Sequence, residues 1–200
     1  MNLSPKYTPF KHWIADGEFS ASLVEAANVE WPSNNWPHWH LYKGFDSYKY
    51  ATKDVERLSP ACKLLFDQLC CIDISSLTGD EVFPDLTGYG AGLHWIPENG
   101  HLHKHLDSNV HPVTNWVRKY SMCLYLNEVE GGFLHLETKH GSQTTKIETK
   151  KNRLVVFECG ESSYHRVTPV KSKEGRRSIA SFFWSIEDPP ETTRTSAEFT

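Results

Sequence analysis

Three histidines alternate along one short segment of the chain, and an aspartate continues the alternation. His101, His103 and His105 stand at every second position, and Asp107 follows. Because residues i and i+2 of a β-strand project from the same face, His105 and Asp107 would direct an imidazole and a carboxylate to one point. Both groups are ligands of divalent metals, so this His-x-Asp pair indicates a metal site. The pattern alone is weakly specific, since His135-Leu136-Glu137 has a similar form.

A third ligand is needed to hold an octahedral metal and leave one face open. His165 is the natural candidate, because it lies in another β-rich segment of the sequence. Two histidines and one carboxylate form the facial triad of non-haem Fe(II) oxygenases, which leaves positions for a co-substrate and dioxygen. The sequence therefore predicts a metal centre at His105, Asp107 and His165.

Two adjacent arginines follow the third candidate ligand. Arg177 stands 12 residues after His165, beyond a polar turn at 171–175, so a hairpin would place it across from the 165–170 strand. A guanidinium binds a carboxylate in a two-pronged way, which suits a dicarboxylate chelating the metal at its other end. We assign this role to Arg177, because it begins a strongly apolar strand. A solvated position on the turn fits Arg176 better.

Composition limits the classes of protein to which the chain can belong. The 200 residues suffice for one domain with a sizeable core, and the net charge of −4 gives no reason to expect a nucleic-acid partner. No apolar run approaches the roughly 20 residues needed to span a bilayer, which argues against a membrane protein. The five cysteines are odd in number and lack a CxxC spacing, so we expect reduced thiols and a cytoplasmic location.

The order of elements predicts a single catalytic domain over residues 1–200. Residues 1–80 form a helical and aromatic supporting layer, 85–187 a β core, and 188–200 a polar, flexible tail. Periodicity predicts helices near 17–30 and 59–72, the second with Pro60 in its first turn, and a possible strand within the aromatic loop 31–50. The core contains eight short β-rich runs, near 89–96, 101–107, 120–127, 132–138, 144–148, 153–158, 164–170 and 177–185. This pattern is typical of a sandwich or jelly roll, so the fold class is mainly β with N-terminal flanking helices.

Several segments, taken in order, resemble the prolyl 4-hydroxylase-like 2-oxoglutarate/Fe(II) dioxygenases. The resemblance covers roughly residues 85–185, and the ordered set is more specific than any one piece. It is carried by Trp95 to Asp107, Tyr125-Leu126-Asn127, Gly131 to Leu134, Arg153 to Phe157, His165 to Val170, and Arg177.

The resemblance implies a cupin-like double-stranded β-helix that uses Fe(II), 2-oxoglutarate and O2, with ascorbate as a further possible cofactor. His105, Asp107 and His165 would bind the iron, and Arg177 would hold the distal carboxylate of 2-oxoglutarate. Tyr125 would donate a hydrogen bond near that carboxylate. The co-substrate site is also expected to include Ser181 and Trp95, the latter standing where many members of the family have tyrosine.

The substrate is expected to be a prolyl residue of a peptide or protein, which would be hydroxylated at a C–H bond. One alternative is a free amino acid or another small metabolite, and another is a metal-binding β-helix protein without catalytic activity. The segment 108–119 directly follows the candidate ligand Asp107 and is longer than a tight hairpin, so it is a candidate lid. Within it, Asn109, Trp116 and Arg118 are candidates for substrate contact, although Trp116 could equally pack the loop onto the core.

Overall fold

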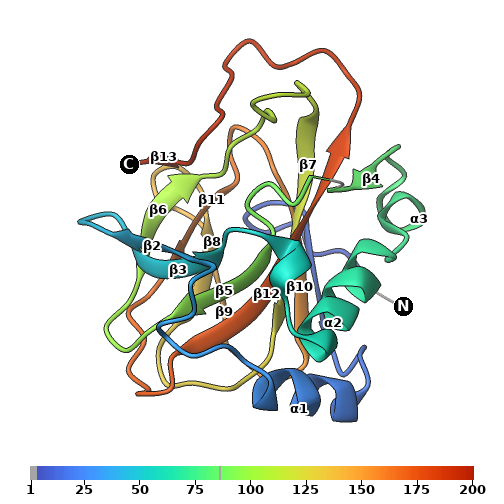
Figure 1. Cartoon of the computed structure of the whole chain (residues 1–200). Helices are drawn as coiled ribbons and strands as arrows, with labels where there is room; N and C mark the ends of the chain where they lie inside the picture. The colour runs from blue at the N-terminus through green and yellow to red at the C-terminus, as the bar shows by residue number, and fades with distance from the viewer. Residues whose placement is uncertain (1–3, 86) are drawn as a thin grey trace.

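Two antiparallel β-sheets face one another in the computed structural model, which describes residues 4–85 and 87–200 (Figure 1). The larger sheet has the strand order β1-β10-β7-β12-β5-β3-β2, and the short strand β4 also pairs with β12. Its strands are β1 (His12–Asp16), β10 (Arg153–Glu158), β7 (Val117–Tyr125), β12 (Arg176–Ser185), β5 (Gly92–Ile96), β3 (Tyr48–Thr52), β2 (Trp39–Lys43) and β4 (Phe83–Pro84). The long strands β7 and β12 form its centre.

The smaller sheet has the strand order β13-β6-β11-β8-β9. It comprises β13 (Glu198–Phe199), β6 (Leu102–Leu106), β11 (Tyr164–Val167), β8 (Leu134–Glu137) and β9 (Thr144–Ile147). Leucine, valine and tyrosine side chains from both inner faces form one core between the sheets, which includes Tyr125, Leu136 and Val155. This is the two-layer arrangement expected for a jelly roll.

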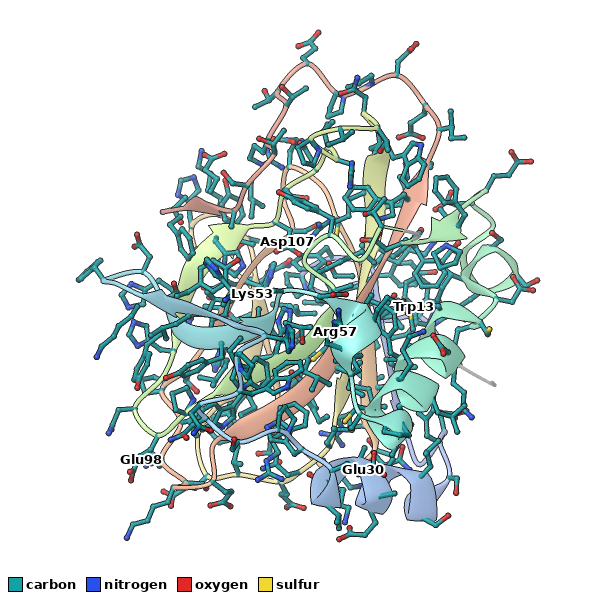
Figure 2. All side chains as sticks on the ribbon, viewed as in Figure 1. Trp13, Glu30, Lys53, Arg57, Glu98 and Asp107 are labelled. Carbon is teal, nitrogen blue, oxygen red and sulfur yellow. The ribbon has the colours of Figure 1, made fainter. Side chains whose placement is uncertain are left out.

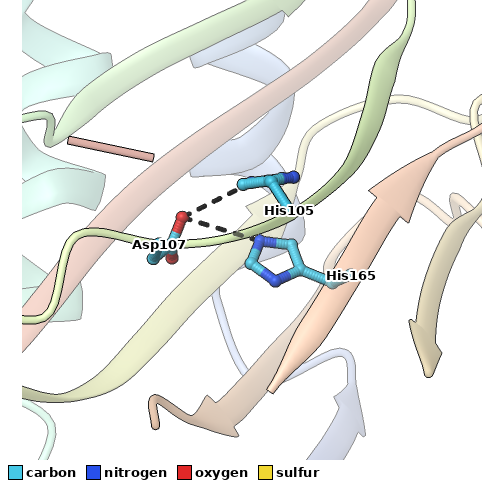
Figure 3. A group of neighbouring side chains, drawn as sticks. All are labelled: His105, Asp107 and His165. Atoms are coloured by element: carbon cyan, nitrogen blue, oxygen red, sulfur yellow. Dashed lines mark ion pairs between the residues drawn. The ribbon is translucent and has the colours of Figure 1, made fainter. Parts of the chain in front are cut away.

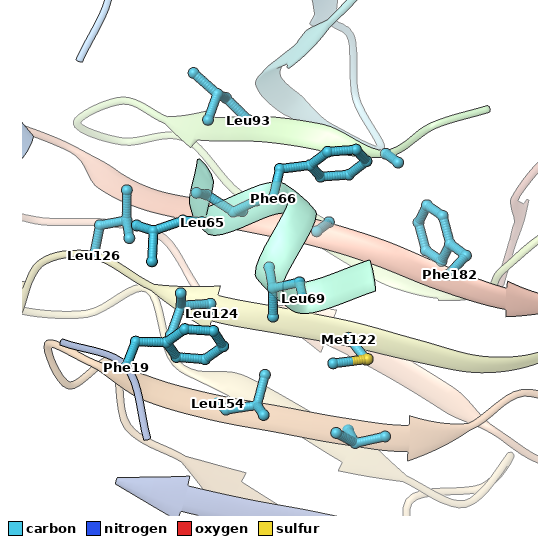
Figure 4. Packing of buried hydrophobic residues seen from close by; sticks show 14 of the residues in the cluster. Phe19, Leu65, Phe66, Leu69, Leu93, Met122, Leu124, Leu126, Leu154 and Phe182 are labelled. Carbon is cyan, nitrogen blue, oxygen red and sulfur yellow. The ribbon is translucent and has the colours of Figure 1, made fainter. Parts of the chain in front are cut away.

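Helices cover the outer face of the larger sheet. They are α1 (Ala21–Val29), α2 (Pro60–Cys70) and α3 (Ile74–Thr78), with a 3₁₀ turn at Val55–Arg57. Figure 4 shows Leu69 of α2 close to Leu124 and Met122 of the sheet and Phe66 on the side of Leu93, all in one hydrophobic cluster with Leu65. These apolar residues are spaced so that they form one buried stripe along the helix. The hydrophobic core on the outer face of the larger sheet is therefore formed in part by α2.

The mainly β fold predicted from the sequence is confirmed. Each of the eight predicted strands of the core has a counterpart in β5 to β12, and α1, α2 and β2 lie within the predicted ranges. Pro60 begins α2. The preceding Ser59 makes no side-chain cap hydrogen bond, and the Glu30 carboxylate accepts a hydrogen bond from the Ala61 amide at 2.8 Å instead. The sequence did not indicate β1, β3, β4, β13 or α3.

The C-terminal segment differs from its prediction as a flexible tail. Residues 188–200 cross over one end of the two sheets and return to the smaller sheet as β13 (Figure 1). Glu198 and Phe199 pair with Leu106 and His105 of β6. The buried Arg194 guanidinium fixes the segment through hydrogen bonds of 2.8 and 2.7 Å to the Glu161 carboxylate. We call residues 188–200 the C-terminal strap.

No helix within residues 4–85 and 87–200 has the length and apolar character required to cross a membrane.

Candidate active site

The predicted metal ligands come together at the inner surface of the smaller sheet. His105 and His165 are register partners on β6 and β11, and Asp107 lies just beyond the end of β6. One ligand atom from each residue lies within 4.8 Å of the other two. Figure 3 shows the Asp107 carboxylate facing both imidazoles, with Oδ1 at 3.5 Å from His105 Nε2 and 3.6 Å from His165 Nε2.

Backbone carbonyls orient both imidazoles for metal binding. His105 Nδ1 lies 2.8 Å from the carbonyl oxygen of His103, and His165 Nδ1 lies 3.1 Å from that of Ser163. A proton on each Nδ1 makes these hydrogen bonds to the carbonyl oxygens. Each Nε2 then keeps a free lone pair on the side of Asp107. Ligating histidines in metalloproteins are fixed in this way by a hydrogen bond from their second nitrogen. The donor set therefore fits an Fe(II) ion.

The Asp107 carboxylate is anchored on its other oxygen. Ser121 Oγ donates a hydrogen bond to Oδ2 at 2.9 Å, and Arg118 lies 3.7 Å from the same oxygen. Burial raises the pKa of Asp107, but the nearby His165, His105 and Arg118 outweigh it and hold the pKa well below its usual value. Asp107 is therefore ionised at neutral pH, as a metal ligand must be.

Arg118 contacts the ligand carboxylate rather than an open substrate surface. It is 4% exposed, and its guanidinium lies 3.7 Å from the centre of the Phe182 ring and 4.7 Å from that of Trp184. The pairing between β7 and β12 shifts register between Phe183 and Trp184, which turns Arg118 to the side on which Asp107 lies. The expected substrate contact of Arg118 is replaced by a role beside the metal ligand.

A cavity opens beside the triad, between the two sheets, in the interior region where Figure 2 labels Asp107. Its wall is mostly apolar, with a few polar and charged side chains directed inward. The lining residues are Lys49, His94, Ile96, Leu102, His105, Asp107, Ser121, Met122, Cys123, Leu134, Phe157, His165, Val167, Arg176, Ser178, Ala180 and Phe182. A concave apolar site with a few convergent polar groups is typical of a small-molecule binding site.

The arginine in this cavity is Arg176, which corrects the expectation for Arg177. Arg176 is 4% exposed, and Ser178, Ala180 and Phe182 follow it on the same face of β12. Among residues 4–85 and 87–200, its guanidinium makes only long hydrogen bonds, 3.4 Å to Ser178 Oγ and 3.9 Å to Cys123 Sγ, and its Nε has no hydrogen-bond partner. A buried cation without an anion fits a carboxylate-bearing co-substrate.

Arg177 projects from the opposite face of β12, toward the helices. Its guanidinium donates to the backbone oxygen of Asn28 at 3.2 Å and lies 5.6 Å from the centre of the Trp31 ring. Ser181 shares this face, and its hydroxyl lies 3.4 Å from the thiol of Cys70 in α2. Successive strand residues alternate between the two faces of a sheet. Arg177 and Ser181 are each one residue away from a residue that lines the cavity, so both face away from it.

Trp95 also lies outside the cavity, whereas its neighbours His94 and Ile96 line it. The Trp95 indole stacks on Tyr50 at 4.9 Å and donates to the backbone oxygen of Glu174 at 3.1 Å. It covers Gly175, where a Cβ would stand 2.2 Å from the indole nitrogen. The expected contact between Trp95 and the co-substrate is therefore corrected to a packing role at the turn before Arg176.

Tyr125 is fully buried next to the cavity arginine. Its ring centre lies 4.6 Å from the Arg176 guanidinium carbon, and its hydroxyl has no hydrogen-bond partner in the part of the chain that the structure describes. Burial raises the pKa of Tyr125 well above its usual value of 10, so the hydroxyl remains a donor at neutral pH. This position agrees with a hydrogen bond from Tyr125 to a bound carboxylate.

The other candidates for substrate contact make structural contacts instead. Asn109 is buried beneath the C-terminal strap, where its amide donates to the backbone oxygen of Thr192 at 2.8 Å and accepts from the Arg194 amide at 2.6 Å. Trp116 packs edge-on against Phe83 at 4.9 Å, which is the packing alternative considered for it. Segment 108–119 is thus held by the strap and the core, not open as a lid.

We expect the strap to loosen when its buried arginine is removed. Arg194→Met eliminates the paired contacts with Glu161, and amide exchange at Thr200, which donates to the Lys104 oxygen, should accelerate by roughly 10-fold. Hydrogen exchange of the metal-free protein measures this. Lys119→Met is the matched control, because its ion pair with Glu187 is exposed and contributes little. Equal exchange in both variants would contradict the anchoring role of Arg194.

His94 should make stability of the metal-free protein depend on pH. Burial, with Lys49 and Arg176 nearby, lowers its pKa to about 3, against 6.5 when unfolded. Between these values the unfolded chain binds more protons, so stability falls as the pH falls below about 6.5. His94→Gln should reduce this loss by on the order of 1 kcal/mol at pH 5, measured by urea unfolding at pH 7.5 and 5. Identical pH dependence in both proteins would disprove the assignment.

Arg176, His94 and Lys49 are cavity residues that sequence reasoning missed. The eight apolar or small residues after Arg177 in β12 are buried on both faces, so the alternation that would identify the cavity face is absent. His94 lies on the same strand face as Ile96. The alternation of residues along this strand could have predicted that from the sequence. Lys49 lies in a segment interpreted as loop, so no pattern indicated its direction.

A family model supplies the decisive comparison for this site. The model of the 2OG-Fe(II) oxygenase superfamily matches residues 91–184, the range that carries the triad and Arg176. Residues 91–184, the β core of the chain, belong to this superfamily. No curated protein matches the chain by sequence. For this oxygenase the residues of the site fit both cofactors of the superfamily, Fe(II) at the triad and 2-oxoglutarate beside Arg176.

Solved structures show the same fold. A prolyl-4-hydroxylase of Pseudomonas putida has 20% identity and a TM-score of 0.60, covering 86% of this chain and 90% of its own. The viral collagen prolyl hydroxylase of Paramecium bursaria Chlorella virus-1, solved with 2OG, has 14% identity and a TM-score of 0.61. The match covers 91% of this chain and 97% of the viral enzyme. The carbocyclase SnoK of nogalamycin biosynthesis has 12% identity and a TM-score of 0.67. The match covers 92% of this chain and 82% of SnoK.

Proposed function

We propose that this oxygenase uses Fe(II), 2-oxoglutarate and O2 to hydroxylate a C–H bond, with a prolyl residue of a peptide or protein as substrate. The observation that supports it most is the presence in one cavity of a His-Asp-His triad and a buried arginine that has no anionic partner among the described residues. The cofactors together supply the oxidation, in which 2-oxoglutarate becomes succinate and CO2 as the substrate gains a hydroxyl group.

The residues of this chain bind and orient the reactants. His105, Asp107 and His165 would hold the metal through their free Nε2 atoms and the ionised carboxylate. Arg176 would bind the distal carboxylate of 2-oxoglutarate, with the Tyr125 hydroxyl as an additional donor. The apolar cavity wall excludes water, which strengthens these charged contacts.

The prolyl substrate is supported by fold likeness to enzymes of that specificity. Among them is a prolyl hydroxylase of Trichoplax adhaerens in complex with a hypoxia inducible factor peptide fragment, at 17% identity and a TM-score of 0.61, covering 86% of this chain and 83% of that one. A free amino acid is the second candidate, because the cation of Lys49 at the cavity wall could bind its α-carboxylate. The five free cysteines in the described residues fit a reducing, cytoplasm-like compartment.

Succinate formation tests the proposal. The protein is incubated with Fe(II), 2-oxoglutarate, O2 and ascorbate, with prolyl peptides or free proline as substrate. We expect succinate formation that increases with a prolyl peptide and is absent in His105→Ala. Turnover that free proline stimulates and peptides do not would support the second candidate. No succinate above the His105→Ala level under any condition would refute oxygenase activity and leave a metal-binding protein.

A further inference from the structure

Lys49 brings a second cation to the cavity from a different part of the chain. In the larger sheet, Tyr50 pairs with Trp95, and Ala51 pairs with His94. Alternation along β3 therefore puts Lys49 on the same face as His94, and it lines the cavity with the metal triad. The ammonium group approaches from β3, whereas Arg176 approaches from β12 on the other side of β5.

The Lys49 ammonium has no acidic partner among the described residues. Its one notable contact is with the face of Tyr42, whose ring centre lies 5.2 Å from Nζ. Burial lowers the pKa of Lys49, and the Asp107 carboxylate counteracts this. Lys49 is partly buried, and its ammonium lines the cavity without a carboxylate partner, so a bound anion would stabilise it.

The charges of the cavity favour an anionic substrate. Two cations, Lys49 and Arg176, line the cavity with one carboxylate, Asp107, and that carboxylate already lies 3.7 Å from Arg118 behind the wall. A divalent metal and a dicarboxylate cancel each other when both bind. Positive charge therefore remains after the cofactors are in place, and it favours the binding of a further anion.

The position of Lys49 indicates that this anion belongs to the substrate. Tyr42, which contacts Lys49, lines an open groove next to the cavity. The groove is bounded by the β2–β3 hairpin and by the segment before β5, and its lining residues are His40, Tyr42, Ala51, Thr52, Lys53, Thr87, Gly88, Tyr89, Gly90 and His111. The contact between Lys49 and Tyr42 therefore joins a residue of the cavity wall to a residue of the groove wall. A carboxylate of a ligand that lies between the groove and the metal would be within reach of Lys49.

We propose that Lys49 is a specificity-determining residue that binds a carboxylate of the primary substrate. This inference rests on the proposed oxygenase function. The carboxylate could be the α-carboxylate of an amino acid or the acidic side chain of a peptide, and both present the same group to the ammonium. Lys49 selects such substrates over uncharged analogues, while Arg176 holds the co-substrate.

Binding to the metal-loaded protein tests the proposal independently of turnover. Calorimetry is performed on protein loaded with Zn(II) and 2-oxoglutarate, with two matched pairs of probes. N-acetylproline against N-acetylprolinamide tests the α-carboxylate, and N-acetyl-Pro-Asp-amide against N-acetyl-Pro-Asn-amide tests the acidic side chain. We expect one charged probe to bind at least roughly 10-fold more tightly than its neutral partner, and Lys49→Met to abolish that preference.

Lys43→Met is the matched control. Lys43 belongs to the same hairpin and lies over the Tyr48 ring at 5.5 Å, but it does not line the cavity, so its variant should keep the preference. No preference for charge in the wild-type protein, or a preference that persists in Lys49→Met, would overturn the proposal. Weaker 2-oxoglutarate binding in Lys49→Met would reassign Lys49 to the co-substrate. Absence of 2-oxoglutarate binding in the wild-type protein would instead refute the proposed function.

Discussion

Replacing Asp107 by alanine is expected to abolish stable metal binding and reduce succinate formation to background. The carboxylate is the sole anionic ligand of the triad, and both histidine Nε2 atoms face it. Its loss also leaves the cations around the site uncompensated, so a divalent ion would enter a repulsive field. Loss of residues that merely orient a ligand costs 10–100-fold in metal affinity, and loss of the ligand itself should exceed about 100-fold. Mn(II) titration followed by electron paramagnetic resonance measures the affinity.

The chain contains its own control for this variant. His135-Leu136-Glu137 is the other His-x-acid sequence of the β core, on β8 of the smaller sheet. There the Glu137 carboxylate accepts a hydrogen bond from Arg166 at 2.7 Å and takes no part in the cavity. His135→Ala should therefore bind Mn(II) as the wild-type protein does. Retained Mn(II) affinity in Asp107→Ala would show that the triad is not the metal site.

The metal triad could be predicted because its geometry follows from local rules. His105 and Asp107 are two residues apart, so strand alternation alone directs both to one face. His165 requires long-range pairing between β6 and β11, which alternation does not give. For that ligand the order of motifs along the chain supplied the information.

The assignment of the cavity arginine depended on strand parity, which the sequence of β12 does not reveal. Ile179, Phe183 and Ser181 face the helices, while Ala180 and Phe182 face the cavity, so both faces are buried. A strand buried on both faces loses its polar–apolar alternation, and an error of one residue reverses every side chain. The expectations for Arg177 and Ser181 failed together for this reason.

The C-terminal strap was missed for a different reason. Its composition is polar with two prolines, which is typical of a mobile end. Order arises from contacts with distant residues, above all those of Arg194 with Glu161 and Asn109. No local sequence pattern predicts contacts between residues so far apart in the chain. The strap places Phe199 at 5.1 Å from the His105 ring, so it shields one side of the metal ligands.

Substituting Arg176 and Arg177 separately gives the sharpest test of the co-substrate site. Arg176→Met should weaken 2-oxoglutarate binding by at least about 100-fold, because a two-pronged ion pair in an apolar cavity is lost. The fold should survive, since the variant removes a buried cation that has no ion pair in the described residues. Arg176→Lys keeps the charge without the paired donors and should give an intermediate affinity.

Arg177→Met should show the opposite pattern. It loses a hydrogen bond to Asn28 and the contact with the Trp31 ring, at a cost of about 1 kcal/mol, or a melting temperature lower by roughly 2–4 °C. Its affinity for 2-oxoglutarate should match that of the wild-type protein, because its guanidinium lies on the far side of β12 from the cavity. Calorimetric titration of Zn(II)-loaded protein and thermal unfolding measure the two effects separately. If Arg177→Met rather than Arg176→Met weakened 2-oxoglutarate binding, the face of β12 assigned to the cavity would be wrong.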